Sequence, residues 1–143
     1  MNTKNNSLDQ AAPKSWEDVP EIQVHQFLAE AVMFWTEGTV KPVNLSLEDE
    51  KWFLDGEGKR AHRCEFWKPC TNPEQAKEVL AEIGWILQND HGLTGFELHA
   101  RLGTLGTALC LADLDPRLAL VTALKHVLES PVPEGIGKEL MHA

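Results

Sequence analysis

The sequence predicts an α+β fold in which an antiparallel sheet of about four strands, arranged as two hairpins, packs against three helices. Three observations predict this class: helix-type apolar periodicity in three segments, two pairs of strand-like runs with glycine-containing turns, and the order helix, hairpin, helix, hairpin, helix. A length of 143 residues suits one domain. We expect a flexible tail over residues 1–17, a single domain over 18–130 and a loose tail over 131–143.

The first helix is predicted over residues 20–35, where apolar side chains recur at steps of three and four. These side chains are Val24, Phe27, Leu28, Ala31 and Trp35. Gly38 is expected to follow the end of this helix as its C′ residue. Residues 39–50, which contain a proline and an acidic run, are expected to form a connection.

The first hairpin is predicted from two strand-like runs, residues 51–55 and 60–67, which flank a tip with two glycines. On the second run, Arg63 and Trp67 are expected on one face of the strand, because side chains alternate between the two faces. Pro69 then removes a backbone donor and ends the strand.

The second helix is predicted over residues 72–88, and its start carries the clearest signals in the chain. Asn72 supplies an N-cap oxygen and Pro73 suits the first helical position. Gln75 completes a capping-box pattern three residues after the cap. An apolar stripe continues from this start to the end of the segment.

The second hairpin is predicted from alternation of apolar and polar residues over 96–102 and from an apolar run over 107–112, with a Gly-containing turn between them. Asp115 as N-cap and Pro116 at the first helical position then begin the third helix. That helix completes the α+β arrangement.

The charge balance restricts the class of partner. The chain has a net charge of -9, with 43% hydrophobic and 24% charged residues, which is typical of a globular domain apart from its acidity. An acidic surface disfavours nucleic-acid phosphates and anionic membranes, and it favours solubility or a basic protein partner. Three cysteines without a signal-peptide pattern indicate a cytoplasmic protein with reduced thiols. No window approaches the ~18 apolar residues that a membrane span needs.

The strongest metal candidate in the sequence is His62-x-Cys64 together with Cys70, which gives three soft ligands in nine residues. The candidates for a fourth ligand are His25, His91 and His99. The spacing matches no standard zinc motif, and a free cysteine is often a small core residue. We therefore expect neither a metal nor a cofactor.

Nucleophilic catalysis is also weakly supported. Cys70 lies at the entrance of a predicted helix, where a thiol pKa can be lowered. No nucleophile elbow and no Cys-x-x-Cys pair accompany it. The sequence thus predicts no catalytic residue, and we expect the protein not to be an enzyme.

The side chains best suited to a protein interface lie in and before the first hairpin. An acidic run would steer a basic partner, while tryptophan and arginine most often anchor interfaces. The predicted partner-binding residues are Glu48, Asp49, Glu50, Trp52, Arg63 and Trp67. The alternative interpretation places each tryptophan, including Trp85, in the core, since such large side chains are highly buried on average.

Three stretches of the chain resemble the phage ABA sandwich domain family, which comprises small proteins of bacteriophages and prophages. The stretches are the helix segment over residues 28–35, the corner Phe66-Trp67-Lys68-Pro69-Cys70-Thr71-Asn72-Pro73-Glu74-Gln75-Ala76, and the run over residues 108–112 before the last helix. This chain departs from the family in its Pro69-Cys70-Thr71-Asn72 corner and its longer acidic connection. The resemblance implies a phage accessory protein in the cytoplasm of a bacterial host, and it transfers no catalytic residue.

Two functions follow as hypotheses. The first is a non-enzymatic accessory protein that binds and modulates a bacterial host protein, with inhibition of a host defence component as one form. The alternative is a protein that binds or sequesters a nucleotide-like small molecule through Arg63 and an aromatic platform. This alternative expects Arg63, Trp67 and His99 to line one pocket. Homo-oligomerisation stays open.

Overall fold

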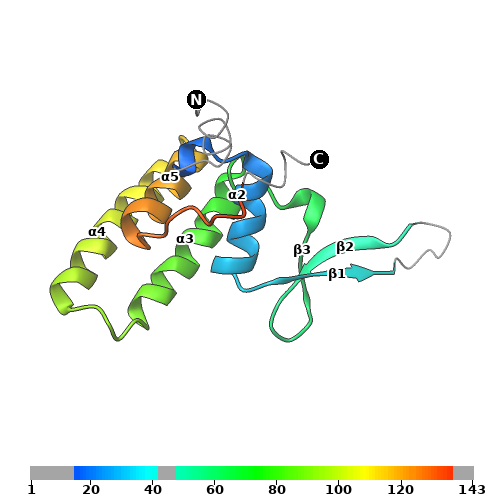
Figure 1. The fold of residues 1–143 in the computed structure, drawn as a ribbon, viewed down its shortest axis with the longest axis horizontal. Coiled ribbons are helices and arrows are strands. Elements are labelled where there is room, and N and C mark those ends of the chain that lie inside the picture. Colours follow the sequence, from blue (N-terminus) through cyan, green and yellow to red (C-terminus); the bar gives the residue numbers. More distant parts are fainter. Residues whose placement is uncertain (1–14, 42–47, 137–143) are drawn as a thin grey trace, which may run out of the picture.

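The computed structural model describes residues 15–41 and 48–136. It confirms the α+β class, with one three-stranded antiparallel sheet in the order β1–β2–β3 and four helices packed together (Figure 1). The expectation of about four strands in two hairpins with three helices is therefore wrong in its details. The helices are α2 (Glu21–Phe27) with the π-helical continuation η2 (Leu28–Val32), α3 (Pro73–Gln88), α4 (Gly95–Leu111), and α5 (Pro116–Thr122) with the π-helical continuation η4 (Ala123–Val127). The strands are β1 (Thr36–Val40), β2 (Glu50–Leu54) and β3 (Arg60–Arg63), and the 3-10 helices are η1 (Trp16–Asp18) and η3 (Cys64–Phe66).

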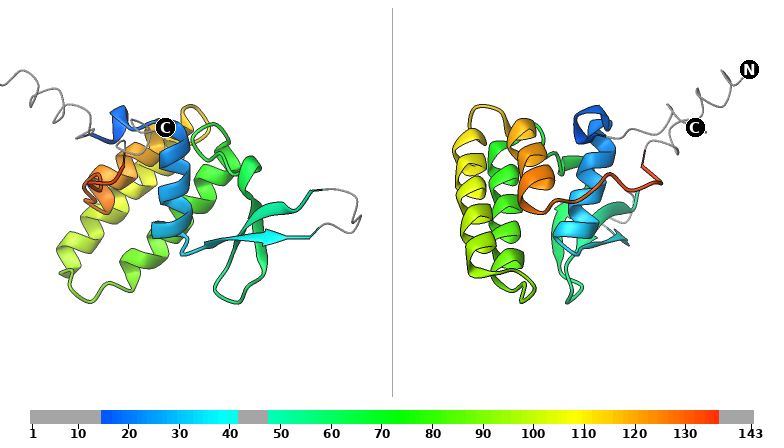
Figure 2. Two further views of the ribbon diagram at one scale, coloured as in Figure 1. Left: turned by 45° about the vertical axis from the view of Figure 1, so that its right-hand side comes forward. Right: turned by 60° about the vertical axis from the view of Figure 1, so that its left-hand side comes forward.

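The helices form the larger part of the molecule. Helix α3 packs against α4 and α5 and is also contacted by η2, so it lies at the centre of the helical part. The sheet extends from the side of α2, away from α4 (Figure 1), and the second views show the same arrangement (Figure 2). None of the helices in the described ranges is long and apolar enough to cross a membrane.

The core has two connected zones. Between the helices it is aliphatic, and its fully buried members include Val24, Leu28, Val79, Leu80, Ile83, Leu120, Leu124 and Val127. Between α2 and the sheet it is aromatic. There the ring of Trp35 lies 4.8 Å from that of Trp67, in an edge-to-face arrangement, and 6.1 Å from that of Phe53. This aromatic zone attaches the small sheet to the helices.

The domain begins earlier than the sequence suggested. Trp16, which we placed in the flexible tail, is 1% exposed and lies 4.7 Å from the ring of Phe27. Its Nε1 donates a hydrogen bond to the carbonyl oxygen of Ser130 at 2.8 Å, which joins the two ends of the described chain. Beyond residue 130, Val132 and Ile136 pack partly against the core. The expected tails over residues 1–14 and 137–143 lie outside the described residues.

The end of the first helix and the role of Gly38 were predicted wrongly. The helix ends near Phe34, whose positive φ of 58° is typical of a C′ residue, and the N–H of Trp35 donates to the carbonyl of Ala29, six residues earlier, at 2.9 Å. Gly38 instead lies in strand β1, which we had read as the start of a connection. A Cβ at this glycine would lie 2.6 Å from Leu54 Cδ1, so the glycine makes room for a side chain of the neighbouring strand.

The second predicted hairpin is instead helix α4. The carboxylate of Glu97 accepts from the N–H of Thr94, and the hydroxyl of Thr94 accepts from the N–H of Glu97, which completes a capping box. Leu105, Ala108 and Ala112 share the buried face at helical spacing. The alternation over residues 96–102 predicted a strand because Leu98 and Leu102, four residues apart, fit the strand period of two as well as the helical period of 3.6.

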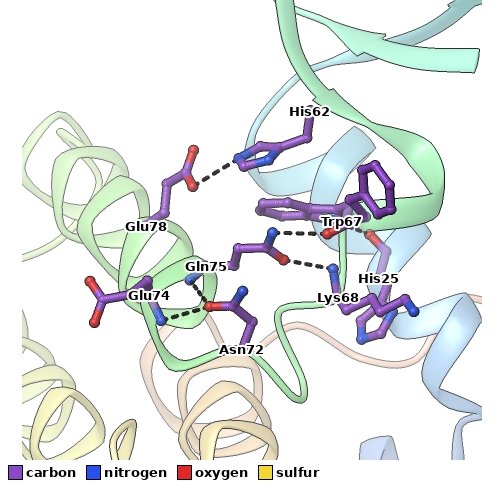
Figure 3. A network of polar contacts seen from close by, with 9 residues as sticks. His25, His62, Trp67, Lys68, Asn72, Glu74, Gln75 and Glu78 are labelled. Atoms are coloured by element: carbon purple, nitrogen blue, oxygen red, sulfur yellow. Dashed lines mark hydrogen bonds and ion pairs between the residues drawn. The ribbon is translucent and has the colours of Figure 1, made fainter.

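The first hairpin is confirmed, but its second strand is shorter than predicted. Strand β3 ends at Arg63 and the chain enters the 3-10 helix η3, so the alternation expected to continue to Trp67 breaks. Helix α3 begins at Pro73 with Asn72 as N-cap, as predicted (Figure 3). Gln75 makes no capping box: its amide donates to the carbonyl of Phe66 at 2.9 Å and accepts from the N–H of Lys68 at 2.6 Å. The corner is therefore tied to α3 by one buried amide.

Replacing Asn72 with alanine should lower the free energy of unfolding by about 1–2 kcal/mol. The Asn72 side chain accepts hydrogen bonds from the N–H groups of Glu74 at 3.0 Å and Gln75 at 3.1 Å, and alanine leaves both without a partner. Thr71→Ala is the matched control, because its hydroxyl only donates to the carbonyl of Lys68 at 3.3 Å and should contribute little. Denaturant unfolding measures both. Equal stability of Asn72→Ala and the unmodified protein would contradict the cap.

Candidate functional site

An acidic hollow lies where β2 begins and β3 ends. Its volume is about 540 Å³, within the usual range of binding pockets. Its charged lining consists of Glu48, Asp49, Glu50, Lys51, Arg63 and Glu65. Four of the six residues predicted to bind a partner thus meet in one concave site. Carboxylates outnumber cations there by four to two, so the hollow favours a positively charged ligand group.

Arg63 organises the base of this hollow. Its guanidinium forms an ion pair with Glu50, with Nη1 3.6 Å from Oε2, and a second ion pair with Glu65. The guanidinium carbon also lies 5.0 Å from the centre of the Phe66 ring, at cation–π distance. Arg63 Nε is buried and has no hydrogen-bond partner within residues 15–41 and 48–136. These contacts fix Arg63 in the protein, so the carboxylates of Glu48 and Asp49 are the ones left for a ligand.

Glu48 and Asp49 are exposed, and no cationic side chain of the described part of the chain pairs with either of them. They precede β2 directly, which holds their backbone beside the ion pairs of Arg63. Glu48 and Asp49 thus form an exposed pair of carboxylates beside Glu50 and Glu65, which are paired with Arg63. Such an exposed pair can accept a lysine or arginine side chain from another molecule.

Trp52 lies on the outer face of the sheet. It is directly opposite Arg63 in the antiparallel pairing, whereas its neighbour Phe53 points into the aromatic core. Its Nε1 donates to Glu50 Oε1 at 2.9 Å, and the guanidinium of Arg60 lies 5.4 Å from its ring centre. Trp52 is half-buried and does not itself line the hollow, but it contacts Glu50 and lies opposite Arg63, which do.

Trp67 does not belong to this surface, which corrects our partner-binding set. It is 2% exposed, and its Nε1 donates to the carbonyl of His25 at 2.9 Å (Figure 3). The break of the strand at residue 63 turns its side chain inward. The exposed aromatic ring at this place is that of Phe66, at 58% exposure, which the sequence analysis did not select.

The residues required by the small-molecule alternative do not line one pocket. Arg63 belongs to the acidic hollow, Trp67 to the core, and His99 is exposed on α4, on the far side of α3 from the sheet (Figure 1). The described residues therefore do not bring Arg63, Trp67 and His99 together as the small-molecule alternative expects.

The structure does not gather the metal candidates of the sequence. His62 Nε2 lies 3.1 Å from Glu78 Oε1 on α3 (Figure 3), and neither His62 nor Cys64 belongs to a convergent group of ligands within the described ranges. Cys70 does belong to such a group, together with Glu21 and His25. The sequence analysis named Cys70 as a ligand and His25 as one of three candidates for the fourth ligand of the same cluster, but it missed Glu21, one turn before His25.

Cys70 does not have the lowered pKa that its position before a helix suggested. Its burial raises the pKa of the thiol to about 12, so the thiol is protonated at neutral pH. Burial also lowers the pKa of His25, whose Nε2 accepts a hydrogen bond from the N–H of Cys70 at 3.2 Å. This environment does not favour a nucleophilic cysteine.

Comparison with known proteins adds no assignment: no protein family, no curated protein and no solved structure matches this chain.

Proposed function

We propose that the protein acts by binding another protein, and that the acidic hollow receives a lysine or arginine side chain of that partner. The observation that carries this proposal is the excess of carboxylates in the hollow, where Arg63 is held by Glu50 and Glu65 while no cation within residues 15–41 and 48–136 pairs with Glu48 or Asp49. A single exposed ion pair contributes only about 0–1 kcal/mol. Charge alone would therefore give a weak complex.

The aromatic side chains beside the hollow provide the second part of the interface. Trp52 and Phe66 flank Arg63, and both present apolar surface next to charged groups. Buried aromatic residues surrounded by polar groups are typical of interface hot spots. We infer that the partner places an apolar side chain against this pair and a basic side chain in the hollow.

The partner class follows from the resemblance to the phage family, which implies a protein of the bacterial host. In this proposal the protein modulates that host protein by stoichiometric binding, without catalysis. Inhibition of a defence component is one form that such modulation takes.

Capture from a bacterial lysate with tagged protein tests this function when three forms are compared. The unmodified protein should retain a host protein in stoichiometric amount, and the Glu48→Lys/Asp49→Lys variant should lose it. A charge-matched control, Glu82→Lys/Glu134→Lys, changes two carboxylates outside the hollow and should retain it. Equal capture by all three forms would overturn the proposal. A retained nucleotide that depends on Arg63 but not on Glu48 and Asp49 would favour the small-molecule alternative.

A further inference from the structure

We propose that Glu21, His25 and Cys70 form a binding site for a zinc-class divalent cation. Within residues 15–41 and 48–136 they are the one group of histidine, cysteine and acidic side chains with convergent ligand atoms, all within 4.8 Å of one another. The site shares no residue with the acidic hollow, so a test of the metal site does not depend on whether the proposed function is correct.

Two elements bring the three ligands together. Glu21 and His25 are four residues apart on α2 and therefore lie on the same face of the helix. Cys70 lies in the corner before α3, and the hydrogen bond from Trp67 Nε1 to the carbonyl of His25 holds that corner against α2. The ligands thus sit on a packed part of the fold, which is the arrangement that a preorganised metal site requires.

The ligand atoms suit zinc. A thiolate sulfur, an imidazole nitrogen and a carboxylate oxygen are its three usual protein ligands, and sites with three of them hold water in the fourth position. In a tetrahedral zinc site the ligand atoms lie about 3.3–3.8 Å apart, given bond lengths of about 2.0–2.3 Å. The separations of up to 4.8 Å would have to shorten by about 1 Å. The flexible side chain of Glu21 is able to supply much of that movement.

The charges also balance. The carboxylate of Glu21 and the thiolate of Cys70 together neutralise the two positive charges of the cation, and His25 binds as a neutral imidazole. On binding, the sulfur–metal bond forms and the thiol proton is released to solvent. Burial raises the pKa of this thiol to about 12, but a coordinated thiol is deprotonated by the metal itself.

Solvent reaches Glu21 and His25 through a cleft of about 640 Å³ that is also lined by Lys68 and Thr71, while Cys70 lies buried behind them at 4% exposure. The cleft provides both a path for the ion and room for a water ligand. The lone pair of His25 Nε2 already faces the corner, where it accepts from the N–H of Cys70 at 3.2 Å, at the long end of the usual range. A metal ion would take the place of that donor.

Titration with Co²⁺ tests the site, because a cobalt–thiolate bond gives a charge-transfer absorption that carboxylate and imidazole ligands do not give. The full chain, stripped of metal with a chelator, should show this absorption and reach a plateau at one equivalent. Adding Zn²⁺ should remove the absorption and raise the melting temperature. A chain that gives no thiolate absorption with Co²⁺ would overturn the proposal.

Variants locate the ligands. Cys70→Ser should lose the thiolate absorption, whereas Cys64→Ser and Cys110→Ser, which change the other two cysteines, should keep it. Glu21→Gln should weaken Zn²⁺ affinity more than about 100-fold, since even second-shell changes cost 10–100-fold. Glu21 is only half-buried, so this variant still decides the matter if Cys70→Ser fails to fold. Unchanged Zn²⁺ affinity in Glu21→Gln, or loss of the absorption in Cys64→Ser or Cys110→Ser, would contradict the assignment.

Discussion

Trp67→Ala should lower the free energy of unfolding by about 3–5 kcal/mol, the usual cost of truncating a large aromatic side chain in a core. Trp67 is 2% exposed, and its ring contacts those of Trp35 at 4.8 Å and His62 at 4.9 Å. The substitution opens a cavity between the sheet and α2, and it removes one donor, at 2.9 Å, from the carbonyl of His25, which keeps its hydrogen bond from the N–H of Leu28. Urea or guanidinium unfolding, followed by circular dichroism, measures the loss.

Trp85→Ala is the matched control for this prediction. Trp85 is 63% exposed on α3, and a surface substitution should change stability by less than about 0.5 kcal/mol. The loss of unfolding free energy for Trp67→Phe should lie between those for Trp67→Ala and Trp85→Ala, because phenylalanine keeps an aromatic ring but lacks the indole N–H. A loss below about 1 kcal/mol for Trp67→Ala would show that the aromatic zone does not attach the sheet as described.

Substitution of charged residues in the hollow and of aromatic residues beside it should change binding to the captured host protein in different ways. Glu48→Lys/Asp49→Lys should slow association by about 10-fold or more at low salt and weaken its salt dependence, because these carboxylates steer a basic partner. The pair is chosen to leave Glu50 and its contacts with Arg63 and Trp52 intact. Surface plasmon resonance at two salt concentrations measures both effects.

Trp52→Ala should instead weaken the complex by about 30-fold or more, mainly through faster dissociation, as expected for an interface anchor worth about 2 kcal/mol. Trp85→Ala serves again as the control, since Trp85 lies on α3 outside the hollow. Equal dissociation rates for Trp52→Ala and Trp85→Ala would show that the outer face of the sheet is not part of the interface.

Local chemistry in the sequence explains which elements could be predicted. The start of α3 was recoverable because Asn72 and Pro73 specify a helix N-terminus through their own geometry. Helix α4 was missed although Thr94 and Glu97 form a capping box, since Leu98 and Leu102 also fit a strand period. Strand β1 was missed because its Gly38 suggested a helix end. The glycine instead makes room for the side chain of Leu54 on the neighbouring strand, and no local sequence pattern reveals that contact.

The candidate site shows the same division. The acidic run and Arg63 were recoverable from residue type, and the pairing of β2 with β3 brings them together as proximity in the hairpin suggests. The burial of Trp67 was not recoverable, because it depends on where β3 gives way to η3. Phe66 was missed for the same reason. The cluster of Glu21, His25 and Cys70 joins segments 45 residues apart in sequence, and only the packing of the corner on α2 creates it.

Chemical-shift mapping with a basic peptide tests the acidic hollow most directly. Isotope-labelled protein is titrated with a short peptide of lysine, arginine and one tryptophan, and in parallel with the same peptide in which glutamine replaces every basic residue. We predict saturable shifts confined to residues 48–52 and 63–66 with the basic peptide and none with the glutamine peptide. Shifts of equal size with both peptides, or no saturable shift in these two segments, would contradict the claim that the hollow receives a basic side chain.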